Sequence, residues 1–293
     1  MEIPRIDYRK KYKLIASVWD RAVIGTGTLS RILAKSIVPA PQTKVISKTL
    51  YGFDLLIDPV IDRGVEQSLY YFGTYEKGTL HFIEEHLKKG DVFYDVGANI
   101  GLMAIFAANQ VGSAGKVIAF EANPETLGIL NYNIGLNYAK QIQSVGKAIG
   151  SENGFVEIYN NWAVNRGGAT IVKPNDSALS SQVEMISIDG SPEFGNGRID
   201  MVKIDVEGFE MNVLKGMTQV LKRDKPPILI VECSADRKND YTSINDLYRF
   251  IKSVNDYKVY KLSNGKERYG QLVEVKNEAE LPRHDNIFCL KND

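Results

Sequence analysis

Five short segments rich in apolar residues, separated by segments with helical periodicity, dominate the middle of the chain. These segments predict strands at Val92–Val96, Lys116–Phe120, Ile142–Ile149, Ile199–Ile204 and Ile228–Val231. The last has four consecutive apolar residues, and such unbroken runs indicate strands buried on both faces, which is typical of parallel sheets. Helices are predicted between them, one over Ile100–Asn109 and one whose apolar face comprises Val213, Leu214, Met217, Val220 and Leu221. Strands that alternate with helices predict an open, doubly wound α/β sheet.

The first sixty residues follow a different pattern. Residues 8–37 predict a helix in two pieces with a break near Gly25 and Gly27, and Lys44–Asp58 contains two β-rich runs that suggest a hairpin. We therefore expect an N-terminal helical segment and β-hairpin over residues 1–60, followed by one larger domain over residues 61–293.

Local signals place further elements. Three apolar residues share one face of a helix that starts near residue 76: Leu80, Ile83 and Leu87. Gly90 is expected to cap the end of this helix. Asn123 followed by Pro124 predicts a helix start, because asparagine caps free backbone amides and proline is tolerated in the first turn. Phe155–Tyr159 and Val183–Ile188 predict an antiparallel insertion.

Charge narrows the classes of function. The chain has 36 basic and 36 acidic side chains, so its net charge is zero and no nucleic-acid surface is expected. A local basic cluster lies near the N-terminus: Arg5, Arg9, Lys10, Lys11 and Lys13. This cluster suggests either weak peripheral contact with a membrane surface or an arm that packs on the chain or forms a homodimer.

Cysteine content and hydropathy bear on the compartment. Cys233 and Cys289 each lie in an apolar, strand-like run, so we expect two buried free thiols, which fits a reducing cytosol. No run approaches the roughly 18 apolar residues that a membrane helix requires, and the apolar stretch Leu14–Trp19 is too short for a signal peptide. The sequence therefore predicts a cytoplasmic protein without a transmembrane segment.

The segment DVGANIG, residues 95–101, lies where a predicted strand leads into a predicted helix. Backbone amides at such a junction point toward a ligand. Gly97 allows a sharp turn there. A dinucleotide fingerprint has a second glycine where this chain has Asn99, so the loop favours a ligand with an adenosine and a small carboxylate over a pyrophosphate. Asp95 at the strand end suits an amino or other cationic group.

A second motif, FEANPE, begins at the end of the second predicted strand. Its Glu121 follows Asp95 by 26 residues. In a doubly wound fold, a carboxylate at this place reaches the two ribose hydroxyls of an adenosine. The alternative is a plain turn and helix start, which Asn123 and Pro124 already explain.

A third motif, KIDVEGFE, places Asp205 and Glu207 at the carboxyl end of the fourth predicted strand, and Glu232 ends the fifth. Ligands bind at this edge of such sheets. Three acids that converge there could bind a divalent cation or supply a general base. Alternatively, Asp205 and Glu207 only stabilise the N-terminus of the helix that starts near Gly208.

Taken together, the motifs resemble a known family. In order and spacing, GTYEKGTL, GDVFYDVGANIG, FEANPE, IDGSPEF, IDMVKIDVEGFEMNVLKG and ILIVECS are similar to FkbM-type methyltransferases, over roughly residues 60–232 and the closing strand NIFCL. The resemblance implies S-adenosylmethionine as cofactor and a class I methyltransferase (Rossmann-like) fold with an antiparallel C-terminal strand. It also implies O-methylation of sugars on surface glycans, signalling oligosaccharides or polyketide natural products.

The resemblance also assigns residues to the cofactor. Asp95, Gly97, Asn99 and Gly101 match the family's cofactor loop, Glu121 its ribose-binding acid, and Ala148 the place where such folds contact adenine. The full set expected to contact the cofactor is Tyr75, Glu76, Asp95, Gly97, Ala98, Asn99, Gly101, Glu121, Ala122, Asn123, Ala148 and Asp205.

A looser similarity links the acids to magnesium-dependent sugar methyltransferases. In those enzymes, acids at the ends of strands four and five hold the ion, which here would be Asp205 and Glu232. Their second position carries paired aspartates, whereas Glu232 is followed by Cys233. A Mg²⁺ ion is thus an open expectation.

Candidate acceptor contacts lie outside these motifs. The insertion contains NRGGAT with Asn165 and Arg166, and Trp162 nearby could stack on a sugar face, although a glycine-rich hairpin with one aromatic residue is common. His284, before the closing strand, could assist catalysis or simply lie on the surface. His81 lies on a helix with core periodicity and is expected to be structural.

The chemistry of methyl transfer assigns roles to the acids. A sulfonium methyl donor is already activated, so the protein must align an acceptor and remove its proton. We expect Glu207 to be the base, with Asp205 and Glu232 orienting the substrate or an ion. One alternative, a nucleotide-sugar oxidoreductase, is disfavoured because Asn99 replaces a required glycine. Another, a non-catalytic cofactor-binding protein, is disfavoured by the intact set of acids.

Overall fold

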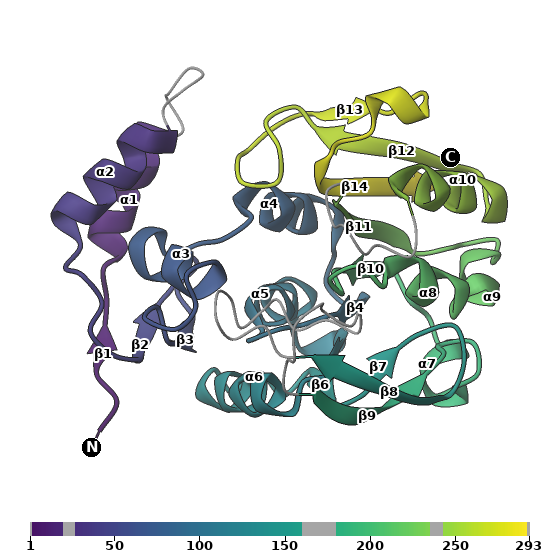
Figure 1. Ribbon diagram of the computed structural model, residues 1–293, viewed down its shortest axis with the longest axis horizontal. Coiled ribbons are helices and arrows are strands. Elements are labelled where there is room, and N and C mark those ends of the chain that lie inside the picture. Colours follow the sequence, from purple (N-terminus) through teal and green to yellow (C-terminus); the bar gives the residue numbers. More distant parts are fainter. Residues whose placement is uncertain (1, 20–26, 160–179, 235–242, 292–293) are drawn as a thin grey trace.

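An eight-stranded sheet forms the centre of the molecule (Figure 1). The computed structural model describes residues 2–19, 27–159, 180–234 and 243–291. Across the sheet, the strands are β13 (Leu272–Glu274), β12 (Tyr257–Leu262), β14 (His284–Lys291), β11 (Ile228–Ser234), β10 (Met201–Ile204), β4 (Val92–Val96), β5 (Lys116–Phe120) and β6 (Ile142–Val145). Neighbours from β11 to β6 are parallel, whereas β14 is antiparallel to β11 and β12. The predicted doubly wound α/β sheet is confirmed, and its order is that of the class I methyltransferase fold.

Helices cover both faces of this sheet. One face carries α4 (Lys77–His86), α5 (Leu102–Val111) and α6 (Pro124–Leu136), and the other carries α7 (Pro192–Gly195), α8 (Glu210–Lys215), α9 (Thr218–Leu221) and α10 (Ile244–Val254). Strand β5 divides its side chains between them: Val117 and Ala119 join the core under α5, and Ile118 and Phe120 join the opposite core. Two buried cores explain why these strands carry apolar side chains on both faces. Cys233 lies in β11 and Cys289 in β14, and both are buried free thiols, as predicted.

The N-terminal segment forms a separate layer at the edge of the molecule (Figure 1). Its elements are β1 (Arg5–Ile6), α1 (Arg9–Trp19), α2 (Gly27–Ile37), β2 (Val45–Lys48), β3 (Asp54–Ile57) and α3 (Val65–Phe72). The two predicted helices and the β2–β3 hairpin are confirmed, while Gly25 lies outside the described residues. Strand β1 pairs in parallel with β2, which the sequence did not suggest because two residues carry no periodicity.

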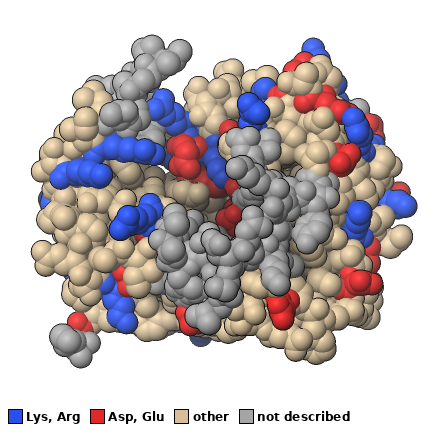
Figure 2. Space-filling view, in the orientation of Figure 1, with Lys and Arg blue, Asp and Glu red and all other residues tan. Residues whose placement is uncertain are grey.

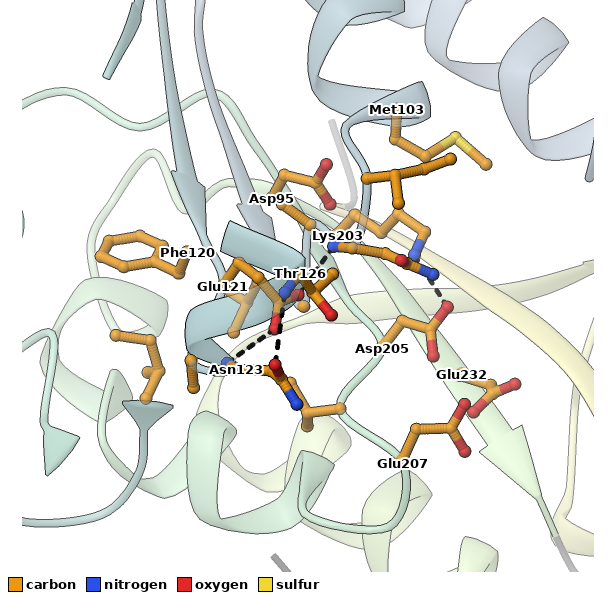
Figure 3. Close-up of a pocket in the computed structure, with 18 of the residues that line it drawn as sticks. Asp95, Met103, Phe120, Glu121, Asn123, Thr126, Lys203, Asp205, Glu207 and Glu232 are labelled. Carbon is orange, nitrogen blue, oxygen red and sulfur yellow. Dashed lines mark hydrogen bonds and ion pairs between the residues drawn. The ribbon is translucent and has the colours of Figure 1, made fainter. Parts of the chain in front are cut away.

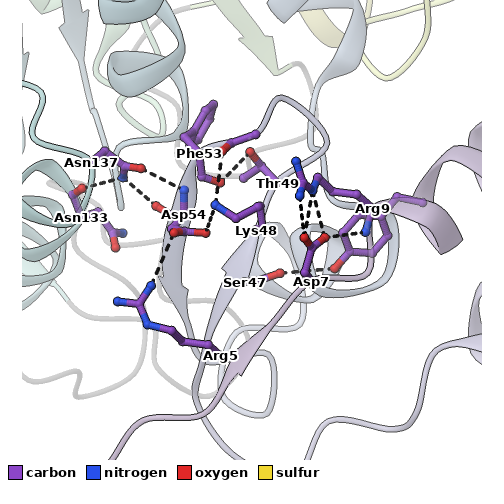
Figure 4. Close-up of polar contacts among 12 residues, drawn as sticks. Arg5, Asp7, Arg9, Ser47, Lys48, Thr49, Phe53, Asp54, Asn133 and Asn137 are labelled. Carbon is purple, nitrogen blue, oxygen red and sulfur yellow. Dashed lines mark hydrogen bonds and ion pairs between the residues drawn. The ribbon is translucent and has the colours of Figure 1, made fainter.

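Two asparagines of α6 bind the free edge of strand β3 (Figure 4). Asn133 Oδ1 accepts from Leu56 N at 2.7 Å, and Asn137 Oδ1 accepts from Asp54 N at 2.9 Å while its Nδ2 donates to Asp54 O at 2.7 Å. Residues four apart on a helix lie about 6 Å apart along its axis, and residues two apart on a strand about 6.7 Å. The spacings match closely, so the asparagine amides satisfy the edge that another strand would otherwise cover.

The predicted third strand, Ile142–Ile149, is wrong as one unit. The chain leaves the main sheet after β6, and β7 (Ala148–Ile149) pairs in parallel with β9 (Ser180–Ile186). Strand β9 also pairs antiparallel with β8 (Gly154–Tyr159), which confirms the predicted insertion. The buried apolar residues of the two halves, Ile142 and Val145 in β6 and Ala148 and Ile149 in β7, belong to different sheets.

The predicted helix after β10 is also interrupted, between α8 and α9. The carbonyl of Gly216 accepts from Asp189 N at 2.8 Å instead of continuing the helix. The Asp189 carboxylate then accepts from Gln219 N at 2.7 Å and Val220 N at 3.1 Å, and so caps the start of α9. A residue from a distant loop therefore breaks a helix whose own apolar pattern is continuous.

The predicted cap at Gly90 is wrong. Helix α4 ends at His86 with Leu87 in an extended conformation, and Gly90 lies in the following turn, where its N–H donates to Val111 O at 2.9 Å. His81 on α4 packs edge-on against Tyr269, with ring centroids 4.6 Å apart. This contact agrees with its expected structural role.

Candidate active site

A pocket at the carboxyl ends of β4, β5, β10 and β11 brings together most of the predicted site residues (Figure 3). Those that line it are Tyr75, Glu76, Asp95, Gly97, Ala98, Asn99, Glu121, Ala122, Asn123, Ala148, Asp205, Glu207 and Glu232. Parallel strands end at the same sheet edge, so residues more than 100 positions apart meet there. The fold thus assembles all three motifs into one site.

Gly101 and His284 are not part of this lining, and three further predicted contacts lie outside the described residues. Gly101 precedes α5 with φ 94°, and a Cβ there would lie 2.7 Å from the Leu130 side chain, so its role is the packing of α5 on α6. His284 is exposed, and its Nδ1 lies 3.1 Å from Ser234 Oγ. Trp162, Asn165 and Arg166 lie outside the described residues.

The turn after β4 is shaped by close backbone approach. Gly97 has φ 85°, and a Cβ there would lie 1.9 Å from Asp205 O. The N–H groups of Gly97 and Ala98 both donate to Phe120 O, at 3.0 and 2.9 Å. Asn99 has φ 50°, a left-handed conformation that asparagine tolerates better than most residues. The asparagine that departs from the dinucleotide fingerprint therefore still serves the turn.

Glu121 is fixed by backbone amides. Its Oε2 accepts from Asn99 N at 2.8 Å, and its Oε1 accepts from Asn123 N at 2.9 Å. Burial raises the pKa of Glu121 to about 7, although both hydrogen bonds act to lower it. A carboxylate offers about four acceptor positions, so each oxygen can accept one further hydrogen bond. This geometry fits the two neighbouring hydroxyls of a ribose.

Asp95 has a different environment. Its side chain is only 1% exposed, and neither oxygen accepts a well-formed hydrogen bond within the described part of the chain. Burial raises the pKa of Asp95 to about 6, while Lys203 opposes the shift. A buried carboxylate without well-formed hydrogen bonds is costly and indicates a missing partner. The ammonium group of a methionine moiety would supply one.

Two lysines pair with the acids at the other end of the pocket. Lys203 Nζ lies 2.9 Å from Asp205 Oδ2, and Lys266 Nζ lies 2.7 Å from Glu76 Oε1 and 3.1 Å from Glu232 Oε1. Burial acts to lower the pKa of Lys203 and of Lys266, but the neighbouring carboxylates outweigh it and raise both. These lysines are cations at neutral pH.

Sequence reasoning missed both lysines as site residues. Lys203 stands two positions before Asp205 on β10, so strand alternation places both side chains on one face, a signal that was available. Lys266 follows β12, 190 residues after Glu76, and no local pattern links them.

The predicted Mg²⁺ site does not fit this arrangement. Asp205 and Glu232 each face an ammonium group at hydrogen-bonding distance, and a cation bound between them would be repelled by both lysines. Residues 2–19, 27–159, 180–234 and 243–291 contain no group of three or more His, Cys, Asp or Glu side chains placed to hold a metal ion. The paired acids at this edge of the sheet therefore do not fit a magnesium ion.

The backbone at Glu207 argues against a purely capping role. Glu207 has φ 57°, and Gly208 has φ 102°. Helix α8 begins later, at Glu210, whose Oε1 accepts from Val206 N and from Gly208 N, both at 3.1 Å. Glu210 is therefore the acid that satisfies the free amides of this turn. The turn holds Glu207 at the pocket in a conformation that costs about 1–3 kcal/mol for a non-glycine residue.

The order of the strands and the helices on both faces of the sheet define the class of protein: a class I methyltransferase. The Methyltransferase FkbM domain family matches residues 95–259, more than half of the chain. The chain therefore belongs to the FkbM methyltransferase family of S-adenosylmethionine-dependent enzymes.

Two curated relatives of the chain are also named as methyltransferases. The chain is 27% identical over 164 residues to Methyltransferase sdnD of Sordaria araneosa, covering 46% of this chain and 63% of the relative. It is 28% identical over 175 residues to Hexuronic acid methyltransferase AglP of Haloferax volcanii, covering 56% and 65%. The crystal structure of Methyltransferase FkbM from Methylobacillus flagellatus KT is similar at 16% identity and a TM-score of 0.44, covering 96% of this chain and 58% of that one. Each match spans less than two thirds of the relative's length.

Within the described residues, no helix is both long and apolar enough to cross a membrane.

Proposed function

We propose that this chain transfers a methyl group from S-adenosylmethionine to a sugar hydroxyl on a glycan, a glycolipid or a glycosylated natural product. The observation that carries the proposal is Glu207. It lines the pocket at the turn after β10, where Glu210 accepts from the backbone amides of Val206 and Gly208.

The cofactor's orientation follows from the chemistry of the lining. Glu121 suits the ribose, Ala148 the adenine, and Asp95 the amino group of the methionine moiety. In Figure 3 the side chains of Asp205, Glu207 and Glu232 lie on the other side of the pocket from Glu121. The cofactor supplies an activated methyl group, and this orientation directs that group toward the acids.

Charge supports an uncharged reacting group on the acceptor. Six carboxylates line the pocket, at Glu76, Asp95, Glu121, Asp205, Glu207 and Glu232, against Lys147 and Lys203 in the lining and Lys266 beside Glu76 and Glu232. Such a lining attracts a sulfonium and repels an acceptor that presents an anion at the reacting position. The name of the Haloferax volcanii relative, a hexuronic acid methyltransferase, supports a sugar as the acceptor class.

The proposed step needs one proton acceptor. The hydroxyl oxygen of the sugar bonds to the methyl carbon as the carbon–sulfur bond breaks, and the hydroxyl proton passes to the Glu207 carboxylate. The products are a methyl ether and S-adenosylhomocysteine. Lys203 and Lys266 hold Asp205 and Glu232 in place, so that these acids can orient the acceptor.

The test compares Glu207→Gln with Glu125→Gln. Both remove a carboxylate near a helix N-terminus, but Glu125 is exposed in the first turn of α6 and does not line the pocket. With S-adenosylmethionine and a panel of neutral glycans, loss of a general base lowers turnover by about 10²–10⁴-fold. Turnover by Glu125→Gln should stay close to that of the wild type. The affinity of Glu207→Gln for S-adenosylhomocysteine should also be close to the wild-type value.

Two results would contradict the proposal. Near-normal turnover of Glu207→Gln with a lowered melting temperature would make Glu207 a structural residue. Cofactor binding without methyl transfer to any acceptor would favour the alternative of a non-catalytic cofactor-binding protein. Mass spectrometry of the acceptors detects transfer directly.

A further inference from the structure

The helices α1 and α2 carry a charge that the rest of the chain does not share. The whole chain is neutral, yet the described parts of these two helices contain no acidic residue. Their basic residues are Arg9, Lys10, Lys11, Lys13, Arg31 and Lys35. Figure 2 shows Lys and Arg side chains gathered over this end of the molecule. The pair of helices therefore forms a local region of positive charge.

Four of these cations are available to a partner. Arg9 pairs with Asp7 at 2.6 Å, and the Lys11 ammonium lies over the Tyr8 ring at 4.5 Å. The remaining four are exposed and have no acidic partner among the described residues: Lys10, Lys13, Arg31 and Lys35. Exposed cations of this kind attract anionic surfaces at little cost in desolvation.

Large aliphatic side chains lie on the same helices and are more than half exposed. Leu14 on α1 is 54% exposed, and Leu29 and Ile32 on α2 are 56% and 57% exposed. Leu14 is one position from Lys13 and four from Lys10, so all three lie on one face of α1. On α2, Ile32 lies between Arg31 and Lys35 along the chain and shares their exposed side. Apolar side chains bordered by lysine and arginine are the chemistry of an interfacial helix.

The opposite faces of the same helices are committed to the fold. Tyr12, Ile15 and Ala34 are at most 1% exposed. Tyr12 donates from its hydroxyl to Tyr70 O on α3 at 2.9 Å, and its ring fills the space where a Cβ at Gly73 would lie. The exposed faces of α1 and α2 are therefore distinct from the faces that pack against the rest of the fold.

We propose that the exposed faces of α1 and α2, which we call the basic helical face, dock on an anionic membrane surface. Lys10, Lys13, Arg31 and Lys35 meet lipid phosphates, and the three aliphatic side chains enter the boundary between headgroups and acyl chains. A second copy of the chain fits less well, because two such faces would bring like charges together.

The basic helical face is coupled rigidly to the active site. Tyr12 holds α1 against α3 through its hydrogen bond to Tyr70 O. Val65, at the start of α3, lines the pocket, and so does Tyr75, which follows α3 in the sequence. Docking would therefore hold the pocket at a set orientation to the bilayer. If the proposed sugar methylation holds, the acceptor class is a glycan carried on a lipid. The assignment of a lipid-carried glycan as acceptor rests on the proposed function, whereas the docking proposal does not.

Vesicle sedimentation with the full chain tests the proposal. We expect binding to phosphatidylcholine vesicles that contain about 30% phosphatidylglycerol, and none to phosphatidylcholine alone. Raising the salt should release the chain, because the screening length falls from about 10 Å at 0.1 M to about 3 Å at 1 M. Each lysine near an anionic bilayer contributes about fivefold in affinity, so Lys10→Ala/Lys13→Ala should weaken binding by well over tenfold.

Two further variants complete the design. Leu29→Ser/Ile32→Ser should also weaken vesicle binding, because it removes the apolar anchor. The matched control is Lys88→Ala/Lys89→Ala, which removes two exposed lysines between α4 and β4 and should bind vesicles as wild type does. Unchanged affinity for S-adenosylhomocysteine in every variant shows that each one folds.

Three outcomes would overturn the docking proposal: equal binding to neutral and anionic vesicles, an equal loss in the control variant, or a dimer that the Leu29→Ser/Ile32→Ser variant cannot form. The proposed function fails separately. A chain that binds anionic vesicles but methylates no sugar contradicts the function alone, and a chain that methylates free glycans but ignores vesicles contradicts docking alone.

Discussion

The two ends of the active-site pocket are built in different ways. At the cofactor end, Glu121 is held by two backbone amides, and the turn around Gly97 is held by the carbonyl of Phe120. At the acid end, Glu76 and Glu232 are held by the side chain of Lys266, which comes from a distant loop. The first end depends on the course of the backbone and the second on a balance of buried charge. Substitutions should therefore affect the two ends separately.

The largest expected effect comes from breaking the cofactor end with Gly97→Ala. The added Cβ would overlap Asp205 O, a backbone atom that cannot move without disturbing β10. We expect cofactor binding to be lost and stability to fall by about 3 kcal/mol or more. Gly52→Ala is the control, because Gly52 has φ 93° but nothing within 4 Å of its added Cβ. It should cost only about 1 kcal/mol, as measured by denaturant titration.

The next largest effect should come from Lys266→Ala, which breaks the acid end. Glu76 is 1% exposed, and without Lys266 its charge would be buried uncompensated, a loss of about 3–5 kcal/mol at neutral pH. Arg249→Ala, which removes a surface pair with Glu278, should change stability little.

Lys266→Ala also tests whether the cofactor end and the acid end of the pocket are independent. If they are independent, Lys266→Ala should retain most of its affinity for S-adenosylhomocysteine, measured by calorimetry under conditions where it is folded. A large loss of affinity in a folded variant would show that the acid end also shapes the cofactor end.

A smaller effect should appear in the pH dependence of cofactor binding. Glu121 must be ionised to accept two ribose hydroxyls, and its pKa of about 7 in the free chain means that many molecules carry a proton there at neutral pH. Affinity should therefore rise with pH up to about 7, by at most tenfold per unit, and binding should release a proton. Calorimetry in buffers of different ionisation enthalpy measures the release. Glu121→Gln should bind weakly and release none.

The same shift has a predictable sign for stability. A carboxyl whose pKa is raised from 4.5 to about 7 by folding binds more protons in the folded state. Its contribution to folding is present below pH 4.5 and is lost as the pH rises to about 7. A thermal shift series across this range should show S-adenosylhomocysteine stabilising the chain more at the higher pH.

The smallest expected effect is that of a chelator. Because Lys203 and Lys266 already neutralise Asp205 and Glu232, turnover in excess chelator should equal turnover with added magnesium. The opposite result would be a loss of turnover in chelator that added magnesium restores. It would show that Asp205 and Glu232 bind a metal ion in place of the lysines.

The sequence predicted the elements whose signals are local. Strands β4 and β5 have the predicted bounds, and Asn123 caps α6 by accepting from Glu125 N and Thr126 N. The cofactor turn belongs to the same category, because strand, glycine and helix follow one another. Features set by distant partners could not be predicted: Asp189 divides α8 from α9, and Lys266 joins two acids across the fold.

The asparagine pair of α6 has a consequence for truncated forms of the chain. Asn133 is fully buried, and Asn133 and Asn137 both donate and accept along the edge of β3. A form that began at residue 61 would leave these amides facing a newly exposed apolar surface, and would favour any extended peptide that could dock there. Two asparagines four residues apart on one helix face are thus a sequence signature of a helix laid along a strand edge, and the same spacing can be sought in the amino-acid sequences of relatives.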